Sequence, residues 1–433
     1  MSSDFHKKIR SLRGMRDVLP KDSYVYRIVE SKIQKILFQY NFQEIRTPIL
    51  ERSDLFDKTI GKNTEVVRKE MYTFLDKNGN IKISLRPENT VGCVRAGIEN
   101  GLFHNSRQRL WYSGPMFRYD RPQSGRYRQF SQIGIEMFGF DAPSFDAELI
   151  SIISRIWRLF SIENCVRLEI NSIGSIHDRK VYSFSLKKFF RSNLKKLDVK
   201  YRELAINDPI RLLDSKDPGL NRLLIHAPSL EEHIDKGSVE HFRKFCKILR
   251  KIGIQYTINK RLVRGLDYYN RTVFEWISDV PDFRKTICAG GRYDHLSDML
   301  GYHRSVPSLG CAIGVERLIT LIGIANRSLI DRYYSSRSID IYLCKHGSVE
   351  LEEMFFFSEK IRDQITNISI MMHYGSDKIK KQIFRANENN AKILIVLRED
   401  IYRSKKVLIQ NLQKKSRSDI VHLDKLYEYF NNI

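Results

Sequence analysis

The sequence predicts an α+β chain with more than one domain. Its 433 residues are too many for one ordinary hydrophobic core. Residues 109–140 read as two β-strands joined by a polar turn, which predicts a hairpin. Beyond residue 338, strand patterns alternate with helix patterns, which is typical of a separate α/β domain with a mostly parallel sheet.

The chain is strongly basic. Lysine and arginine total 74 against 51 acidic residues, a formal charge of +23. A basic surface binds nucleic acid without sequence preference, because the contacts release condensed counterions. Charge alone leaves a second explanation open, compositional drift, since lysine, isoleucine and asparagine are abundant throughout the chain.

Cysteine usage and hydropathy predict the compartment. The six cysteines are scattered without CxxC spacing, which argues against disulfides and against a zinc knuckle. No apolar run approaches the roughly 18 residues of a membrane span. The N-terminus, MSSDFHKKIR, lacks the apolar segment of a signal peptide. We therefore expect a cytoplasmic protein without a membrane partner.

The predicted hairpin has an unusual second strand. Side chains alternate between its two faces, so one face is apolar, with Ile133, Ile135 and Met137. The other face carries Gln132 and Glu136, and Gly134 leaves space between them, as the floor of a small polar pocket would. The hairpin also holds five arginines: Arg109, Arg118, Arg121, Arg126 and Arg128. The pattern predicts an anion site beside a pocket for a small polar group.

The hairpin sequence FRYDRPQSGRYRQFSQIGIEMFG resembles motif 2 of the class II aminoacyl-tRNA synthetases, in the version of the histidyl-tRNA synthetases. The resemblance implies a catalytic domain on an antiparallel sheet at 1–325, with a helical insertion at about 177–260. It implies an anticodon-binding α/β domain at 338–433, after a polar linker at 326–337. The partners it implies are ATP, Mg²⁺, L-histidine and tRNA(His).

The N-terminal part extends the resemblance. Apolar residues at helical spacing predict a helix from Asp22 or Ser23 to about Tyr40. The next segment, FQEIRTPILE, predicts a strand broken at Pro48. It resembles motif 1, which lies at the dimer interface in this class, so the resemblance implies a homodimer.

Residues 81–90 predict a strand, a turn at Pro87 and the start of a helix. The pattern leaves two roles open for Glu88. Either Glu88 and Thr90 point into a site, or Glu88 only stabilises the helix N-terminus. The resemblance implies that Glu88 supplies a carboxylate for the α-ammonium group of the amino acid. The family usually has glycine where this chain has Asn89.

The pattern at 177–260 changes to helical segments. Two of them, SLKKFFRSNLKKL and HFRKFCKILRKIG, are basic and amphipathic. They either meet the acceptor stem of tRNA or are ordinary solvated faces.

The segment RGLDYYNRTVFEW is the most specific signal in the chain. Arg264 begins it, and Tyr268 and Tyr269 precede a strand. Such a tyrosine pair normally packs in a core, but the segment resembles the histidine-specific motif of the family at nearly every position. CAGGRYDHL follows, where the family has glycine in place of His295. LGCAIGVERL, a strand entering a helix at Arg317, resembles motif 3.

The implied reaction begins with attack of the amino acid carboxylate on the α-phosphate of ATP. Because this step joins two anions, it needs fixed positive charge and in-line positioning more than a nucleophile. A guanidinium grips phosphate oxygens in a fork, which lysine does not. The resemblance implies that Arg118 holds the α-phosphate, and that Arg126 and Arg317 lie toward the β/γ end. Arg264 would touch both the histidine carboxylate and the α-phosphate.

The resemblance also assigns the other side chains. Glu136 and Tyr269, beside Tyr268, would bind the two imidazole nitrogens. A ligand without these nitrogens would leave the buried carboxylate and phenol without hydrogen-bond partners, and the site would therefore reject it. Glu88, Thr90 and Gln132 would bind the ammonium group. Arg121 and Gln123 are candidates for the acceptor end of tRNA. Magnesium would bridge the phosphates, and the sequence identifies no ligands for it.

Two other functions compete. The regulatory subunit of ATP phosphoribosyltransferase has a similar core and charges no tRNA, but it typically lacks the C-terminal domain and has eroded motifs. Here all four motif arginines are present, and about a hundred residues follow the core: the arginines are Arg118, Arg126, Arg264 and Arg317. A basic RNA-binding protein without catalytic activity would have no need for Glu88, Gln132 and Glu136 together.

Overall fold

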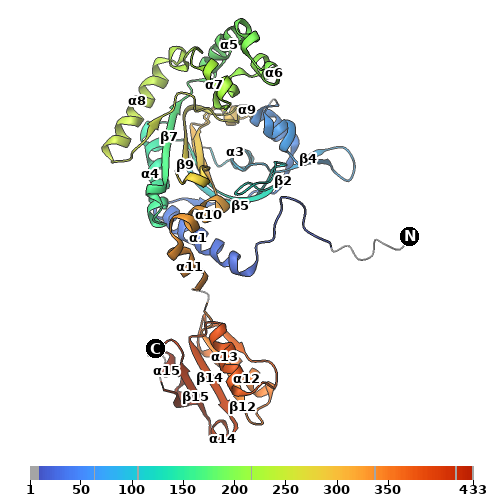
Figure 1. The fold of residues 1–433 in the computed structure, drawn as a ribbon, viewed down its shortest axis with the longest axis vertical. Coiled ribbons are helices and arrows are strands. Elements are labelled where there is room, and N and C mark those ends of the chain that lie inside the picture. The colour runs from blue at the N-terminus through green and yellow to red at the C-terminus, as the bar shows by residue number, and fades with distance from the viewer. Residues whose placement is uncertain are drawn as a thin grey trace, which may run out of the picture. The chain divides into compact units, whose positions relative to one another are not determined.

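The computed structural model describes residues 9–62, 64–104, 107–215, 217–335, 338–414 and 417–431. The chain divides into two compact units, Met1–Ile330 and Asp331–Ile433 (Figure 1). Most of the predicted polar linker is helical, because α11 spans Arg327–Ser335. Ile330 and Tyr333 are buried in this helix, so its sequence is amphipathic as well as polar. Residues 336 and 337 lie outside the described ranges.

The first unit is built on an eight-stranded sheet in the order β1-β5-β6-β11-β10-β9-β7-β8. Its strands are β1 (Gln43–Glu44), β5 (Gln108–Phe117), β6 (Gln129–Phe138), β7 (Val166–Ser172), β8 (Thr257–Ile258), β9 (Asn270–Ser278), β10 (Thr286–Arg292) and β11 (Ser308–Gly314). The central strands pair antiparallel, and the short edge strands β1 and β8 pair parallel. The predicted hairpin is β5–β6, and the predicted fold class is confirmed.

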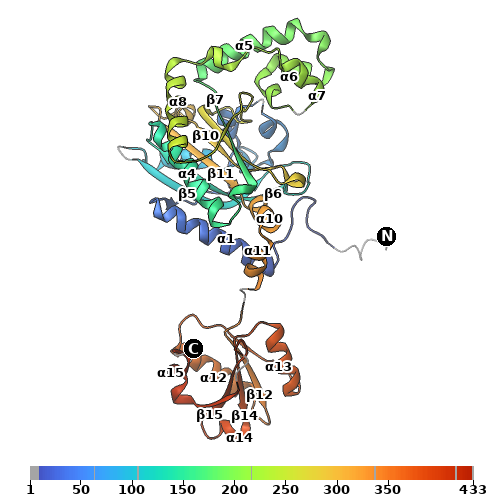
Figure 2. The ribbon, with the colours of Figure 1, turned by 60° about the vertical axis from the view of Figure 1, so that its left-hand side comes forward.

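Helices α1 (Pro20–Gln39), α4 (Pro143–Leu159) and α10 (Val315–Ala325) pack together beside this sheet (Figures 1 and 2). The buried stripe of α1 is the predicted one, with Val25, Val29, Ile33, Ile36 and Leu37. The helix begins earlier than predicted, because Pro20 occupies its first turn, where no backbone N–H is needed.

A buried ion cluster joins the sheet to its helices. Arg292 at the end of β10 is fully buried, and its guanidinium donates to the Asp146 carboxylate of α4 at 2.6–3.0 Å. His241 of helix α8 (Lys236–Lys251) contacts the same carboxylate at 3.2 Å. Burial opposes ionisation of Asp146, but Arg292 still holds the pKa of this carboxyl below its ordinary value.

Asp146→Ala should lower the free energy of unfolding of the first unit by about 3–5 kcal/mol, because it leaves the Arg292 charge buried without its main partner. Urea unfolding followed by tryptophan fluorescence measures this, since Trp111, Trp157 and Trp276 are the three tryptophans of the chain and all belong to this unit. Glu240→Ala, which breaks an exposed pair with Arg243, is the control and should cost far less. An equal effect of both changes would contradict a structural role for the buried cluster.

A small antiparallel sheet, β2-β4-β3, carries the corner that holds Glu88. Its strands are β2 (Leu50–Arg52), β3 (Thr73–Leu75) and β4 (Lys82–Leu85). The neighbouring helices are α2 (Ser53–Phe56), two π-helical turns at Asp57–Gly61 and Val66–Glu70, α3 (Thr90–Glu99) and α9 (Leu296–Met299). The strand broken at Pro48 is therefore confirmed as β1 and β2.

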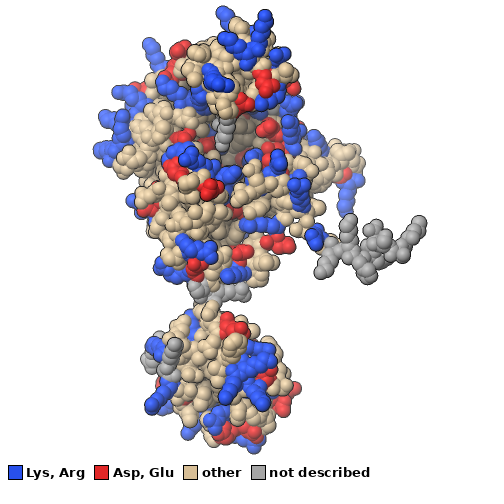
Figure 3. All heavy atoms as spheres, in the orientation of Figure 1, with Lys and Arg blue, Asp and Glu red and all other residues tan. Residues whose placement is uncertain are grey.

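The insertion is helical, as predicted. It contains α5 (Ile176–Ser192), α6 (Val199–Asn207), α7 (Pro218–Leu224) and α8, with short 3-10 turns between them. A capping box of Ser175 and Asp178 starts α5. On the face drawn in Figure 3, lysine and arginine side chains gather over these helices.

The second unit has a five-stranded sheet in the order β13-β12-β14-β15-β16. The strands are β12 (Ile341–His346), β13 (Ile370–Met372), β14 (Ile393–Arg398), β15 (Lys406–Asn411) and β16 (Asp419–His422). Helices α12 (Leu351–Gln364) and α13 (Ile379–Glu388) pack against different buried clusters, and α14 (Glu399–Tyr402) and α15 (Leu426–Asn431) are short.

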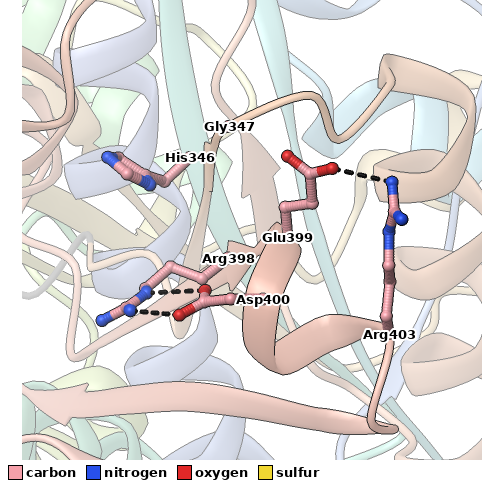
Figure 4. Close-up of a pocket in the computed structure, with 6 residues that line it drawn as sticks. All are labelled: His346, Gly347, Arg398, Glu399, Asp400 and Arg403. Carbon is pink, nitrogen blue, oxygen red and sulfur yellow. Dashed lines mark hydrogen bonds and ion pairs between the residues drawn. The ribbon is translucent and has the colours of Figure 1, made fainter.

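The predicted mostly parallel sheet is wrong at one edge. β13, β12 and β14 are parallel, but β15 and β16 add an antiparallel hairpin that includes an unpredicted strand. The connection from β14 to β15 is too short for a parallel crossover. A hollow of about 420 Å³ lies at the carboxyl ends of β12 and β14, where Arg398 pairs with Asp400 and Arg403 with Glu399 (Figure 4). Across the described residues, no helix is long and apolar enough to cross a membrane.

Candidate active site

A cavity of about 670 Å³ opens over β6, β9, β10 and β11. Its lining includes nine of the twelve side chains predicted for the site: Glu88, Thr90, Arg118, Arg126, Gln132, Arg264, Tyr268, Tyr269 and Arg317. They come from the α3 corner, the hairpin, the loop before β9 and the start of α10. Segments up to 229 residues apart in sequence, from Glu88 to Arg317, therefore converge on one concave polar site.

Four of the predicted arginines line the cavity: Arg118, Arg126, Arg264 and Arg317. Arg118 donates to the Pro87 carbonyl at 2.9 Å. Arg317 donates to the backbone carbonyls of Gly125 and Thr286 at 2.9 and 2.7 Å, which fixes its direction. Burial, together with the charges of Arg126 and Arg118, lowers the pKa of Arg317. A polyanion bound here would relieve this repulsion.

Carboxylates pair with two of the arginines in the cavity. Arg126, which is 44% exposed, pairs with Asp120 and lies 3.8 Å from Glu70. Arg264 pairs with Glu275. Burial alone would lower the pKa of Arg264, but the Glu275 carboxylate raises it above its ordinary value. These carboxylates mark the directions in which each guanidinium is able to bind a negative group.

Glu88 fulfils both roles that the sequence left open. Its carboxylate accepts the backbone N–H groups of Thr90 and Val91 at 2.8 and 3.1 Å, which caps α3. The same carboxylate lines the cavity, and the Tyr268 hydroxyl approaches it at 3.5 Å. Burial raises the pKa of Glu88. An ammonium group in the cavity would meet this carboxylate already held in place.

The two departures from the family pattern are accommodated. Asn89 has φ −126° and His295 has φ −98°, so neither backbone needs the conformational freedom of glycine. The side-chain oxygen of Asn89 accepts hydrogen bonds from the Thr47 hydroxyl and from Arg86. His295 lies 3.1 Å from the Ser305 hydroxyl. Both side chains therefore have polar partners.

Glu136 lies behind the cavity wall rather than in it. It is fully buried, and it accepts hydrogen bonds from the Thr90 hydroxyl at 2.7 Å and from the Tyr293 hydroxyl. Burial raises its pKa to about 8. The structure does not join Glu136 directly to Tyr269, which instead contacts Tyr293, with ring centroids 6.4 Å apart.

Sequence reasoning missed Tyr293. This residue ends the CAGGRY segment, directly after the strand position of Arg292, and it connects the tyrosine pair to Glu136. The only sequence signal was its place after two glycines. Only glycine fits at position 291, because a Cβ there would lie 2.5 Å from the Thr272 carbonyl oxygen and 3.1 Å from the Tyr269 ring.

The space left by Gly134 has a different use from the one expected. A Cβ on Gly134 would lie 2.0 Å from the ring of Tyr112, its partner across the hairpin. The Tyr112 ring, not a ligand, therefore lies over the glycine. Beside it, the buried Gln132 side-chain oxygen has no hydrogen-bond partner among the described residues, and Gln132 lines the cavity. A bound ammonium group would satisfy this acceptor.

Arg121 and Gln123 lie outside the cavity lining. Both are exposed on the loop between β5 and β6, and Gln123 pairs with the backbone of Arg126. They lie at the rim of the cavity, because Gly125 and Arg126 of the same loop line it.

The magnesium expected from the resemblance fits only in part. Within the described ranges, no group of three or more His, Cys, Asp or Glu side chains offers a metal site. Asp120 and Glu275, which line the cavity, already pair with arginines. With so few free carboxylates, the cavity suits Mg²⁺ that is bound mainly by the phosphate oxygens of a nucleotide, which is its usual mode of binding.

Comparison with known proteins agrees with this geometry. The model of the family described as histidyl-tRNA synthetase matches residues 14–318, a range that holds the whole cavity. A histidine–tRNA ligase of Blochmanniella pennsylvanica (strain BPEN) is 44% identical over 418 residues, 96% of this chain and 94% of that protein.

Solved structures share the fold. With the apo histidyl-tRNA synthetase of S. aureus, the match covers 98% of this chain and 100% of that chain, at 32% identity and a TM-score of 0.79. A Bacillus halodurans C protein, described as an ATP phosphoribosyltransferase regulatory subunit/histidyl-tRNA synthetase, matches 92% of this chain and 99% of its own. Its 19% identity and TM-score of 0.59 show a likeness of fold alone. Because the family match contains the entire cavity and the 44% identity extends over nearly the full length, the chain belongs to the histidyl-tRNA synthetase family.

Proposed function

We propose that the protein activates L-histidine with ATP to histidyl-adenylate and transfers the histidyl group to the 3′ end of tRNA(His), releasing pyrophosphate and AMP. One observation carries the proposal. Arg118, Arg264 and Arg317 line the same cavity as the acceptor groups Glu88 and Gln132. A cavity with a cationic side and an ammonium-binding side suits an amino acid beside a nucleotide.

In the activation step, the arginines bring two anions together. Arg118 would hold the α-phosphate, with Arg126 and Arg317 toward the β- and γ-phosphates. Arg264 would hold the attacking carboxylate against the α-phosphate, and it stabilises the charge that builds up between them. No covalent nucleophile is required, because positioning and fixed charge account for the rate increase.

The histidine side chain would enter the tyrosine-lined end of the cavity. Glu88, Thr90 and Gln132 would bind the α-ammonium group of histidine. The imidazole would lie against Tyr268 and Tyr269. Glu136 would influence imidazole binding indirectly, because it holds the hydroxyl groups of Thr90 and Tyr293 in place.

Magnesium bound to ATP would neutralise phosphate charge during activation. Its shell would come mainly from phosphate oxygens and water, because Glu275 pairs with Arg264 and Glu316 accepts the backbone N–H of Ser131. Arg121 and Gln123, at the rim, would meet the acceptor end of tRNA.

We also infer a homodimer, working in the cytoplasm. Five large apolar side chains on or beside the small sheet are 40% or more exposed: Ile49, Leu50, Phe74, Leu75 and Ile81. An apolar surface of this kind is typical of an interaction site, and it adjoins the segment that resembles motif 1. Sedimentation equilibrium tests the dimer.

The deciding experiment is ATP–pyrophosphate exchange with histidine, followed by charging of tRNA(His). A regulatory relative of the fold would bind histidine without exchange, and a basic RNA-binding protein would bind tRNA without either reaction. The four intact arginines and the second unit favour the enzyme over both. Absence of histidine-dependent exchange would refute the proposal.

We assign catalysis to 1–325 and anticodon binding to 338–433. Deleting the residues after 337 should spare adenylate formation, because the whole cavity is lined by the first unit. The same deletion should lower tRNA charging by roughly a hundredfold, through loss of one of two linked binding modules. Parallel exchange and charging assays measure this, and undiminished charging would show that the C-terminal unit has another role.

A further inference from the structure

An arginine of the insertion holds the loop that carries the candidate histidine-binding residues. Arg179, in the first turn of α5, donates two hydrogen bonds from its Nη1 atom. The acceptors are the backbone carbonyls of Asp267 and Tyr269, each at 2.8 Å. The Arg179 side chain is only 18% exposed. The bonds therefore join two segments about 90 residues apart in a largely dry contact.

The opposite side of the same loop is held by residues of the first unit that lie outside the insertion. The backbone N–H of Asp267 donates to the Ile60 carbonyl at 3.0 Å. Gly61, at φ +99°, leaves room for the Asp267 side chain, since a Cβ there would lie 1.9 Å from the Asp267 carboxylate. Arg211 of the insertion approaches that carboxylate at 3.5 Å. The loop is thus held between the π-helical turn Asp57–Gly61 and the insertion.

The position of this loop sets the shape of the cavity. The tilted rings of Tyr268 and Tyr269 pack with their centroids 4.7 Å apart, and the Arg264 guanidinium lies 5.7 Å from the centroid of the Tyr269 ring. All three side chains line the cavity. Removing the Arg179 guanidinium would leave two covered carbonyls without this donor, and the free energy cost of such groups favours movement of the loop toward water.

We propose that Arg179 is a positioning residue for histidine binding, and that the insertion clamps the tyrosine loop onto the catalytic sheet. This inference rests on the proposed function, in which the loop binds histidine. Arg179 touches neither substrate, so it acts through Tyr268, Tyr269 and Arg264. By linkage, histidine binding should in turn tighten the contact between α5 and the loop.

The burial of the charge agrees with this role. Burial lowers the pKa of Arg179, against the opposing effect of Asp267. A charge held in a covered position at such a cost has a specific partner, and here the described partners are the loop carbonyls and Asp267.

The test compares Arg179→Met with Arg179→Lys in the full-length protein. Lys180→Met, which removes one positive charge from the next, exposed position of the same helix, is the matched control. In the substrate-free protein, amide hydrogen exchange of residues 265–269 should quicken in Arg179→Met and stay unchanged in Lys180→Met. This measurement needs no substrate, so it tests the clamp even if the proposed function fails.

Pyrophosphate exchange then gives the KM for each substrate. Arg179→Met should raise the KM for histidine on the order of tenfold, the effect of losing a charged hydrogen bond, with the KM for ATP within about twofold. Arg179→Lys, which keeps the charge and donors, should recover part of the loss. Wild-type hydrogen exchange in Arg179→Met, or equal increases in both KM values, would overturn the inference.

Discussion

Arg264→Ala should reduce histidine-dependent pyrophosphate exchange on the order of a thousandfold, the upper range for loss of one fixed donor at a site of developing charge. The expected effect is large for two reasons. The guanidinium faces both reacting anions, so its loss removes attraction at the point where they must meet. Its removal also leaves the Glu275 carboxylate without its ion-pair partner, with only the Thr286 hydroxyl still donating to it. The uncompensated negative charge at the cavity wall would repel the phosphates of ATP.

The second reason yields its own check. Adding Glu275→Gln to Arg264→Ala should restore part of the activity, because it removes the unpaired charge without restoring the guanidinium. Arg243→Ala, which loses an arginine from an exposed ion pair on α8, should exchange normally. Unchanged tryptophan fluorescence would show that the fold is intact. Near-normal exchange in folded Arg264→Ala would refute its catalytic role.

The elements that the sequence predicted well are those with a strong local pattern. The alternation in β6 and the apolar stripe of α1 are consequences of burying one face, so they are legible in any single sequence. The antiparallel hairpin β15–β16 was missed for the opposite reason. The direction of a strand depends on the length of its connection and on its neighbours. The apolar pattern of KKVLIQNL is compatible with either a parallel or an antiparallel strand.

The site shows the same division. Nine of twelve predicted side chains reach one cavity, because the motifs place them at fixed turns and strand ends. The sequence did not reveal that Tyr293 holds Glu136, or that Tyr112 covers Gly134. Both contacts depend on the pairing register of the strands that carry or adjoin these residues, and alternation alone does not determine that register. Arg179 was missed because its partners are backbone carbonyls, which carry no sequence signal.

Glu136→Gln should weaken histidine binding by at least roughly tenfold, with the KM for ATP within about twofold. Both carboxyl oxygens of Glu136 accept hydroxyl hydrogens, one from Thr90 and one from Tyr293. In its ionised form the Glu136 carboxylate accepts from both hydroxyls, and a positively charged imidazole would favour that form. Glutamine cannot ionise, and it presents an N–H₂ donor to one of the two hydroxyls, so that hydroxyl must turn. Thr90 lines the cavity, and Tyr293 packs on Tyr268 and Tyr269, so the disturbance falls on the histidine side.

Calorimetric titration with histidine, beside exchange kinetics for ATP, separates the two substrates. Tyr293→Phe removes one donor and keeps the ring, and it should share the selective loss. Equal weakening of histidine and ATP by Glu136→Gln would instead mean that Glu136 only supports the fold.

Glu136→Gln, although it weakens histidine binding, should raise the free energy of unfolding relative to the wild type in a defined pH range. Burial raises the pKa of Glu136 from 4.5 to about 8, so between these values the native protein binds one proton more than the unfolded chain. The stabilisation that this proton provides is complete below about pH 4.5 and is lost as the pH rises through about 8. Glutamine has no such proton. Urea unfolding followed by tryptophan fluorescence should therefore show Glu136→Gln gaining stability over the wild type from pH 5 to pH 8, and then no further. A difference that does not change with pH would mean that Glu136 is already ionised in the native protein, despite its burial behind Thr90 and Tyr293.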